Sequence, residues 1–313
     1  MVMRIVDLIA GLDWSESELA QFRALGEYIQ APTIPTTEAE LIAWVRDADY
    51  AILEPLPEGR VSRRVFEQAS KLKGISLVTT WFHWIDTPAA KEKGIVVSNL
   101  GKYSTASVAE MALALILALA RKITISSNST KAGSREYEEF MGFELKDKIL
   151  GVIGMGSIGT YIAKLGQGIG MNVIGYNRTF RESSVPLVPI EQLLRQADVI
   201  SMSLALNEHT ENFLNADKLS LIKPTAIVVN ISREGLIDQE AMYHLLVTNQ
   251  IGGYAFELDE PKKYPVHQEL LRLDNVIATP YIAWYTPEAF QRLKQVTLAN
   301  IRAMIEGKPI NTV

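Results

Sequence analysis

The stretch GVIGMGSIG, residues 151–159, decides the fold of this 313-residue chain. A short apolar run rich in β-branched residues, 148–153, leads into it and predicts a strand, and a helical pattern follows it from residue 160. Gly154, Gly156 and Gly159 therefore fall at a strand–turn–helix corner. Glycine at these positions allows a tight turn, close approach of the backbone to a pyrophosphate, and close packing of the helix on the strand. The start of the helix, at Ser157 and Ile158, would offer free N–H groups to the phosphates.

The residues after this motif complete the prediction of a dinucleotide site. A second strand, expected over 171–176, follows about twenty residues later, as a βαβ unit requires. This spacing favours dinucleotide binding over a glycine-rich turn that arose by chance. An NAD site has Asp or Glu after the second strand to bind the ribose 2′-hydroxyl, whereas this chain has Asn177, Arg178 and Thr179. A guanidinium and two neutral polar side chains favour the 2′-phosphate of NADP(H), although NAD(H) stays open and Arg178 could be a solvated loop residue.

Length and composition exclude several other classes of protein. A chain of 313 residues with 48% hydrophobic and 21% charged residues is typical of a globular protein with two domains. The net charge of −5 and the lack of a Lys/Arg stripe argue against nucleic-acid binding. The chain has no cysteine and no spacing of metal ligands, so we expect no metal. The longest apolar run, 111–120, is too short to span a membrane, so we expect a buried or interface helix there and a cytoplasmic location.

Apolar periodicity predicts alternating strands and helices on both sides of the glycine motif, which indicates α/β domains with parallel sheets. Before the motif, strands are predicted over 4–10, 50–53, 74–78 and 94–97, and helices over 16–25, 38–47 and 62–71. After it, strands are predicted over 171–176, 199–204, 226–230, 251–256 and 276–278, and helices over 190–195, 216–220, 239–248 and 287–306. No linker separates tandem domains, so we expect a dinucleotide-binding domain, 99–285, inserted into a second domain formed by 1–98 and 286–313.

Five motifs, in order along the chain, resemble the D-isomer-specific 2-hydroxyacid dehydrogenase family. They are SVAE at 107–110, the segment 144–159 with the glycine motif, NISREGLID at 230–238, Glu260-Pro261, and NVIATP at 275–280. The resemblance covers nearly the whole chain. It implies a flavodoxin-like substrate domain, an inserted Rossmann domain, a homodimer, and a small 2-keto or 2-hydroxy acid as substrate, with no nucleic-acid or membrane partner.

The resemblance also assigns residues to the cofactor, beyond the glycine motif and residues 177–179. It places Asn230, Ile231 and Glu257 near the nicotinamide, with Glu257 standing where the family has an Asp that contacts the carboxamide. The other residues that it adds are Ser107, Leu204, Ala205 and Ser232.

Hydride transfer to a 2-keto acid needs a cation to bind the carboxylate and an acid to protonate the developing alkoxide. Arg233 follows the strand that ends at Asn230, at the carboxyl edge where α/β sheets bind ligands, and its guanidinium can bind a carboxylate bidentately. Arg233 is therefore the expected substrate anchor; the alternative is a surface ion pair with Glu234 or Asp238. By resemblance, Glu260 would tune the acid, unless it is a solvated loop carboxylate.

The chain departs from the family at the acid itself, because Tyr281 stands where the family has His directly after Thr-Pro. Tyrosine, with an ordinary pKa of about 10, can still donate a proton in the direction of reduction, and a cation such as Arg233 could lower its pKa. Three interpretations stay open: Tyr281 is the proton donor, another group such as His83 supplies the proton, or the site is weak or inactive. His83 could equally be a packed loop residue.

The segment TTWFHWID, residues 79–86, matches the family's substrate loop. By resemblance, backbone N–H groups of Thr80 and Trp81 would flank the substrate carboxylate, and His83 and Trp284 are further substrate-binding candidates. The sequence thus predicts an NADP(H)-preferring 2-keto acid reductase of the glyoxylate or hydroxypyruvate type. The alternative is a catalytically weak or inactive dinucleotide-binding regulatory protein on the same scaffold.

Overall fold

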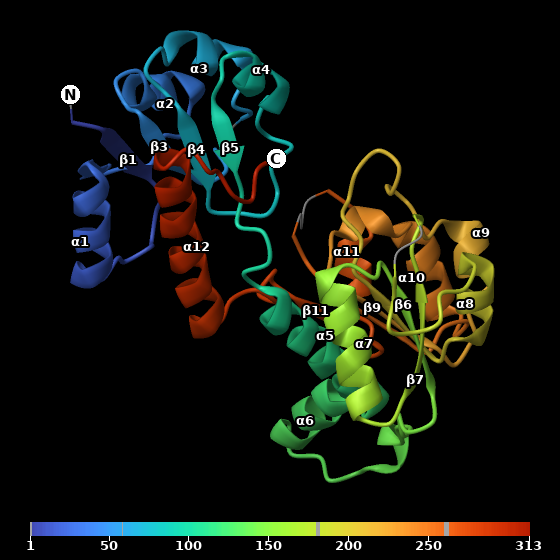
Figure 1. Ribbon diagram of the computed structural model, residues 1–313. Helices are drawn as coiled ribbons and strands as arrows, with labels where there is room; N and C mark the ends of the chain where they lie inside the picture. The colour runs from blue at the N-terminus through green and yellow to red at the C-terminus, as the bar shows by residue number, and fades with distance from the viewer. Residues whose placement is uncertain (1, 58, 180–181, 260–262) are drawn as a thin grey trace. The chain divides into compact units, whose positions relative to one another are not determined.

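The computed structural model describes residues 2–57, 59–179, 182–259 and 263–313, and the chain divides into two units (Figure 1). The first comprises Met1–Ser104 and Thr286–Val313, and the second comprises Thr105–Tyr285. Each unit has one sheet of parallel strands with helices on both faces. The second unit is inserted into the chain of the first.

The sheet of the first unit has the strand order β2-β1-β3-β4-β5, which is the order of flavodoxin-like folds. Its strands are β1 Arg4–Leu8, β2 Glu27–Gln30, β3 Tyr50–Leu53, β4 Gly74–Leu77 and β5 Val96–Ser98. Its helices are α1 Glu16–Leu25, α2 Glu38–Val45, α3 Arg63–Gln68, α4 Thr87–Glu92 and α12 Pro287–Ile305. The apolar pattern does not predict β2 or α4, because β2 has no buried residue and α4 buries only two alanines.

Helix α12 ties the end of the chain to its beginning. It contacts α1 and β4 (red beside blue and cyan in Figure 1), and Leu293 and Phe22 are buried in the same apolar cluster. Asn300 of α12 is fully buried and donates to Ser76 Oγ at 3.2 Å and to the carbonyl oxygen of Asn99 at 2.9 Å. Because buried amides are stable only when hydrogen-bonded, these contacts fix α12 on the sheet.

The sheet of the second unit has the order β11-β10-β9-β8-β6-β7. The strand order reverses at β6, so the carboxyl ends of β6 and β8 flank the crevice where α/β sheets bind ligands. Its strands are β6 Ile149–Ile153, β7 Asn172–Tyr176, β8 Val199–Met202, β9 Ile227–Asn230, β10 Gly253–Glu257 and β11 Val276–Thr279. Its helices are α5 Thr105–Ala120, α6 Ile123–Lys131, α7 Ser157–Gly168, α8 Ile190–Gln196, α9 Ala216–Leu219, α10 Gln239–Val247 and α11 His267–Leu270, with 3₁₀ turns at Glu138–Phe140 and Glu234–Leu236.

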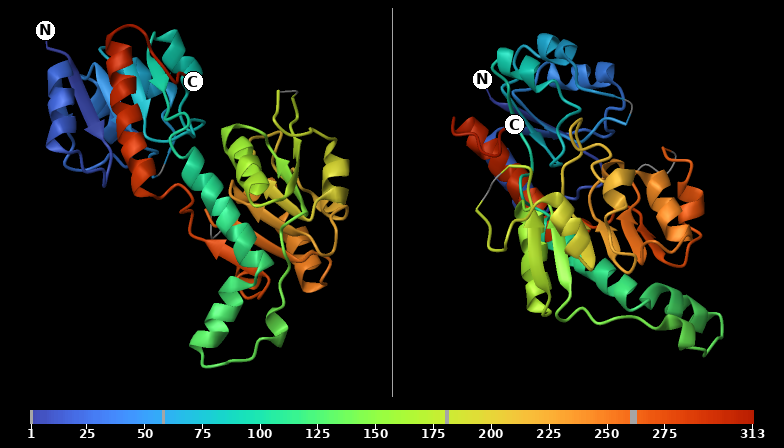
Figure 2. Two further views of the ribbon diagram at one scale, coloured as in Figure 1. Left: turned by 60° about the horizontal axis from the view of Figure 1, so that its bottom comes forward. Right: turned by 90° about the vertical axis from the view of Figure 1, so that its right-hand side faces the viewer.

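The apolar run 111–120 lies in α5, which packs against α7, β9 and β10. Within the described residues, no helix is both long enough and apolar enough to cross a bilayer. Beyond α5, the chain forms an extension, 121–143, that leaves the body of the second unit (green in Figure 2). None of the residues of α6 is buried, and Ile123, Tyr137 and Met141 of this extension are exposed.

Candidate functional site

The glycine loop joins β6 to α7 at the point where the strand order reverses. Gly154 adopts φ +96°, and its N–H donates to the carbonyl oxygen of Tyr176 at 2.9 Å. A Cβ on Gly154 would lie 2.7 Å from the carbonyl oxygen of Ser203, and a Cβ on Gly159 would run into the carbonyl oxygen of Gly154. The backbone of the protein therefore requires glycine at both positions.

Gly156 differs, because nothing in the protein requires glycine there. It is the N-cap of α7, its φ of −76° suits any residue, and a Cβ would meet no atom within 4 Å. No side chain caps the first turn of α7, where Ser157 is exposed and Ile158 is partly buried. Open space beside Gly156 and uncapped N–H groups at a helix N-terminus fit the pyrophosphate of a dinucleotide.

Asn177, directly after β7, supports this fit. Its Oδ1 accepts the N–H of Met155 at 2.7 Å, which holds the glycine loop in place. Its Nδ2 is buried and has no hydrogen-bond partner among the residues that the structure describes. Arg178 and Thr179 follow and are exposed. An unused amide donor next to a guanidinium and a hydroxyl matches the phosphate and ribose oxygens of a nucleotide.

The remaining predicted cofactor residues lie at the ends of β8, β9 and β10 and at the start of α5. Ser107 is buried in the first turn of α5, Leu204 is partly buried and Ala205 is exposed after β8, Ile231 is buried and Ser232 partly buried after β9, and Glu257 is buried at the end of β10. The structure thus groups Leu204, Ala205, Ile231 and Ser232 at the carboxyl edge of the sheet, together with the glycine loop.

Asn230, at the end of β9, shapes the turn that carries Arg233. Its buried Nδ2 donates to the carbonyl oxygen of Arg233 at 3.0 Å, and its Oδ1 accepts the N–H of Ser232 at 3.1 Å. The hydroxyl of Ser232 reaches the carbonyl oxygen of Met202, the last residue of β8, at 3.4 Å. These bonds join β8 and β9 and hold the backbone of Arg233 at the carboxyl edge of the sheet.

The side chain of Arg233 pairs with Asp259, which the sequence analysis did not single out. Arg233 Nη1 lies 2.7 Å from Asp259 Oδ2, and the Arg233 and Asp259 side chains are 33% and 5% exposed. The alternative of a surface ion pair with Glu234 or Asp238 is not what the structure shows. Glu260, the carboxylate that the resemblance selects, lies outside the described residues. The acidic run 257–260 indicates that a carboxylate lies in this segment, but the spacing of its residues does not show which one faces Arg233.

Tyr281 lies next to the Arg233–Asp259 pair. The guanidinium carbon of Arg233 lies 4.6 Å from the centroid of the Tyr281 ring, within the range of a cation–π contact. Partial burial raises the pKa of Tyr281 above its ordinary value, Arg233 opposes this rise, and Asp259 and Glu257 add to it. The expectation that Arg233 would lower the pKa of Tyr281 is therefore wrong in net direction. At neutral pH the phenol keeps its proton.

Glu257 holds the segment on which Tyr281 lies. The Glu257 side chain is buried, and its two oxygens accept the hydroxyl of Thr279 and the N–H of Ala283, the latter at 2.8 Å. Between them, Tyr281 adopts φ +56°, a left-handed conformation that is uncommon for a residue other than glycine and that clusters at functional sites. Glu257 thus binds protein groups with both oxygens. Trp284 follows, partly buried, with its ring edge-on to Tyr285.

The predicted substrate loop lies in the first unit, after β4. The carbonyl oxygen of Thr80 accepts from Asn99 Nδ2 at 3.0 Å, and the N–H of Trp81 donates to Thr79 Oγ1 at 3.1 Å. The Trp81 N–H is therefore engaged within the loop itself. Trp81 is 44% exposed, and Thr80 and His83 are exposed as well.

Two buried side chains next to Arg233 in the chain or in the fold, Glu234 and His267, give no signal in the sequence. Glu234 Oε1 lies 3.5 Å from His267 Nε2, and both side chains are 1% exposed. Gln239 Nε2 donates to the carbonyl oxygen of Glu234 at 2.9 Å. Gln239 Nε2 also lies 3.2 Å from the carbonyl oxygen of Ile237, so the Gln239 side chain bridges the two ends of the 3₁₀ turn after Arg233.

Comparison with known proteins places this site in a family. Residues 113–283 match the model of the NAD binding domain of D-isomer specific 2-hydroxyacid dehydrogenases. The D-3-phosphoglycerate dehydrogenase of Methanocaldococcus jannaschii is 38% identical over 87% of this chain and 52% of its own length, so this chain spans about half of that relative. The hydroxypyruvate reductase of Thermotoga maritima is 34% identical over 89% of this chain and 92% of its own length.

A solved structure gives the same result for the fold. An acyclic imino acid reductase in complex with NADPH and D-Arg superposes with a TM-score of 0.90 and 32% identity, over 99% of this chain and 100% of that one. The expected fold, a flavodoxin-like domain with an inserted Rossmann domain, is confirmed. This chain belongs to the family of D-isomer specific 2-hydroxyacid dehydrogenases.

Proposed function

We propose that this protein is an NADP(H)-preferring reductase of small 2-keto acids of the glyoxylate or hydroxypyruvate type. The observation that carries the proposal is the position of Arg233, at the carboxyl edge of a nucleotide-binding sheet and in contact with the ring of Tyr281. A guanidinium binds a carboxylate, and a neutral phenol beside it can donate a proton. These are the two groups that carbonyl reduction needs from the protein.

The chemistry divides between the bound cofactor and these two side chains. When bound, the reduced nicotinamide supplies a hydride for C2 of the keto acid. Arg233 would bind the carboxylate and stabilise the charge that develops on the carbonyl oxygen. Tyr281 would give its hydroxyl proton to that oxygen, which becomes the product hydroxyl, and the phenolate would then take a proton from water. Glu257, through Thr279 and Ala283, keeps Tyr281 in place for this step.

The cofactor preference rests on the residues after β7. Gly154, Gly156, Ser157, Ile158 and Gly159 would hold the pyrophosphate, and residues 177–179 the adenosine ribose and its 2′-phosphate. The buried Nδ2 of Asn177, which has no partner among the described residues, supports this assignment, as does the lack of a carboxylate at positions 177–179 that would repel a phosphate. The NADPH in the related imino acid reductase supports it as well. NAD(H) would be the poorer cofactor.

The test is NADPH oxidation, followed at 340 nm, with glyoxylate, hydroxypyruvate and pyruvate. We expect turnover with at least one of them and a higher kcat/KM for NADPH than for NADH. Tight NADPH binding without turnover of any 2-keto acid would instead support the inactive dinucleotide-binding protein. Equal or better use of NADH would overturn the cofactor preference.

We also propose a homodimer, with the extension 121–143 as the contact surface. This extension exposes three large hydrophobic side chains, those of Ile123, Tyr137 and Met141. Burial of these side chains against a second copy of the chain would be favourable. Light scattering should give twice the chain mass, and Met141→Glu should shift the particle toward one chain. A wild-type particle of one chain at micromolar concentration would refute the dimer.

A second candidate substrate is a 2-imino acid. Tyr281 favours it, because its raised pKa makes it a weak acid, and reduction of an already protonated imine needs no acid from the protein. The 32% identical imino acid reductase supports this candidate.

A further inference from the structure

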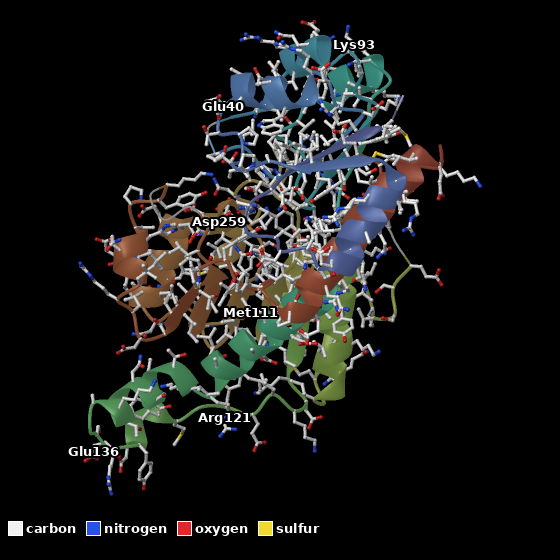
Figure 3. All side chains as sticks on the ribbon, turned by 90° about the vertical axis from the view of Figure 1, so that its left-hand side faces the viewer. Glu40, Lys93, Met111, Arg121, Glu136 and Asp259 are labelled. Carbon is white, nitrogen blue, oxygen red and sulfur yellow. The ribbon has the colours of Figure 1, made fainter. Side chains whose placement is uncertain are left out.

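Asp259 has one carboxylate oxygen that no described group satisfies. Its Oδ2 pairs with Arg233 Nη1 at 2.7 Å, whereas its Oδ1 is buried and has no hydrogen-bond partner among the residues that the structure describes. Asp259 lies two residues beyond β10, and Figure 3 labels its side chain. A buried carboxylate oxygen without a donor is costly, so this position calls for one.

The neighbouring carboxylate makes the contrast clear. The Glu257 side chain, two residues away, is buried as well, but its oxygens accept the hydroxyl of Thr279 and the N–H of Ala283. Both oxygens of Glu257 therefore accept hydrogen bonds from the protein, whereas one oxygen of Asp259 accepts none from the described residues. Asp259 pairs with Arg233, which also contacts the ring of Tyr281. The missing donor is then expected from a ligand that Arg233 holds.

The two candidate substrates differ in what they offer to this oxygen. The carbonyl group of a 2-keto acid has no donor, and its oxygen gains negative charge during reduction, which a carboxylate opposes. The iminium group of a 2-imino acid carries N–H donors and a positive charge, which a carboxylate attracts. We propose that Asp259 Oδ1 accepts an N–H of the substrate's iminium group and so selects 2-imino acids over 2-keto acids with the same side chain.

This proposal rests on the second candidate of the proposed function, a reductase of 2-imino acids, and names the group that selects that substrate class at the same site. In the reduction, C2 of the iminium acid gains a hydride, and the π electrons of the C=N bond become the lone pair of the nitrogen. NADPH is oxidised to NADP⁺, and the product is an amino acid with a neutral amine, which later takes a proton from water. No proton leaves Tyr281, so the loss of the family histidine costs this reaction nothing.

The experiment compares the wild type with Asp259→Asn, which removes the charge at nearly constant volume. Asp217→Asn, an exposed aspartate in the first turn of α9, is the matched control. NADPH oxidation is measured with pyruvate alone and with pyruvate plus ammonium chloride, which forms the imine. In the wild type, ammonium should raise the rate. In Asp259→Asn, the ratio of imine to keto acid kcat/KM should fall about 100-fold, the factor that corresponds to about 2.7 kcal/mol, and in Asp217→Asn it should not change.

A binding measurement decides the same point without turnover. In the presence of NADP⁺, calorimetry on the wild type should show D-alanine binding at least about tenfold more tightly than D-lactate, and Asp259→Asn should abolish this difference. Equal binding of the two acids by the wild type would overturn the proposal, even if Asp259→Asn does not fold. Equal loss of both activities in Asp259→Asn would also overturn it, because Asp259 would then only position Arg233. If the wild type reduced neither substrate, the proposed function would fail, and the binding ratio would still decide the role of Asp259.

Discussion

Two glycines of one loop should respond to alanine in opposite ways. Gly154 has φ +96°, and a Cβ there would lie 2.7 Å from the carbonyl oxygen and 2.8 Å from the carbonyl carbon of Ser203. Gly156 has φ −76°, and a Cβ there would meet nothing within 4 Å. Gly154→Ala should therefore damage the fold, whereas Gly156→Ala should leave the fold intact and damage the nucleotide site.

The cost of Gly154→Ala has two parts. A side chain at positive φ costs about 1–2 kcal/mol, and overpacking against rigid backbone typically adds about 1–3 kcal/mol. The sum, about 3 kcal/mol, corresponds to a fall in Tm of roughly 6–12 °C for a unit of this size. Gly156→Ala carries neither cost, so its Tm should match the wild type, but its methyl group would occupy space that we assign to the pyrophosphate. NADPH affinity should then fall about tenfold or more.

The assays are thermal unfolding by circular dichroism and NADPH titration by fluorescence. Gly168→Ala is the control, because a Cβ at this last residue of α7 also meets nothing within 4 Å. It should lower neither Tm nor affinity. A Gly156→Ala protein that binds NADPH as tightly as the wild type would refute the assignment of this space, and an unchanged Tm for Gly154→Ala would refute the packing argument.

Three further substitutions test the neighbouring parts of the site. Tyr281→Phe should lower kcat for 2-keto acids by about 100-fold. The wild-type rate should stay flat until pH is above about 10, because burial raises the pKa of Tyr281 and keeps the donor protonated. A wild-type rate that falls between about pH 7 and 9, or full activity of the variant, would point to another donor. Glu257→Ala should lower Tm, because the hydroxyl of Thr279 and the buried N–H of Ala283 lose their acceptor, at about 1–3 kcal/mol for an unsatisfied buried donor. It should also reduce kcat more than it changes KM, and an unchanged kcat would separate Glu257 from Tyr281. Asn177→Asp should shift the NADPH/NADH ratio of kcat/KM by about 30-fold toward NADH through repulsion of the 2′-phosphate, and an unchanged ratio would show that no phosphate lies there.

The sequence predicted the strands and helices whose buried residues form a clear apolar pattern. The strands 50–53 and 149–153 are short, apolar and fully or almost fully buried, so periodicity finds them. Edge strand β2 has no buried residue and therefore no apolar pattern to find. Arg233 could be predicted because it stands at a fixed distance after a buried strand, and strand ends meet at the ligand edge of a parallel sheet.

The parts that could not be predicted depend on the path of the chain after each strand. Among the carboxylates of 257–260, only the folded backbone decides that Asp259 faces Arg233 while Glu257 turns to Thr279. The net direction of the Tyr281 pKa depends on burial, which sequence spacing does not contain. Nothing in the sequence pattern marks His267, because its burial beside Glu234 depends on the folded position of α11.

The central claim is that Arg233 binds the substrate carboxylate, and Arg233→Lys tests it most directly. Lysine keeps the charge beside Asp259 but loses the planar, bidentate donor pair and the flat contact with Tyr281. The measurement is kcat/KM for glyoxylate, with the Kd of NADPH determined on the same protein. We predict a fall of about 100-fold in kcat/KM, mainly through KM, with an unchanged Kd for NADPH. An unchanged kcat/KM would contradict the claim.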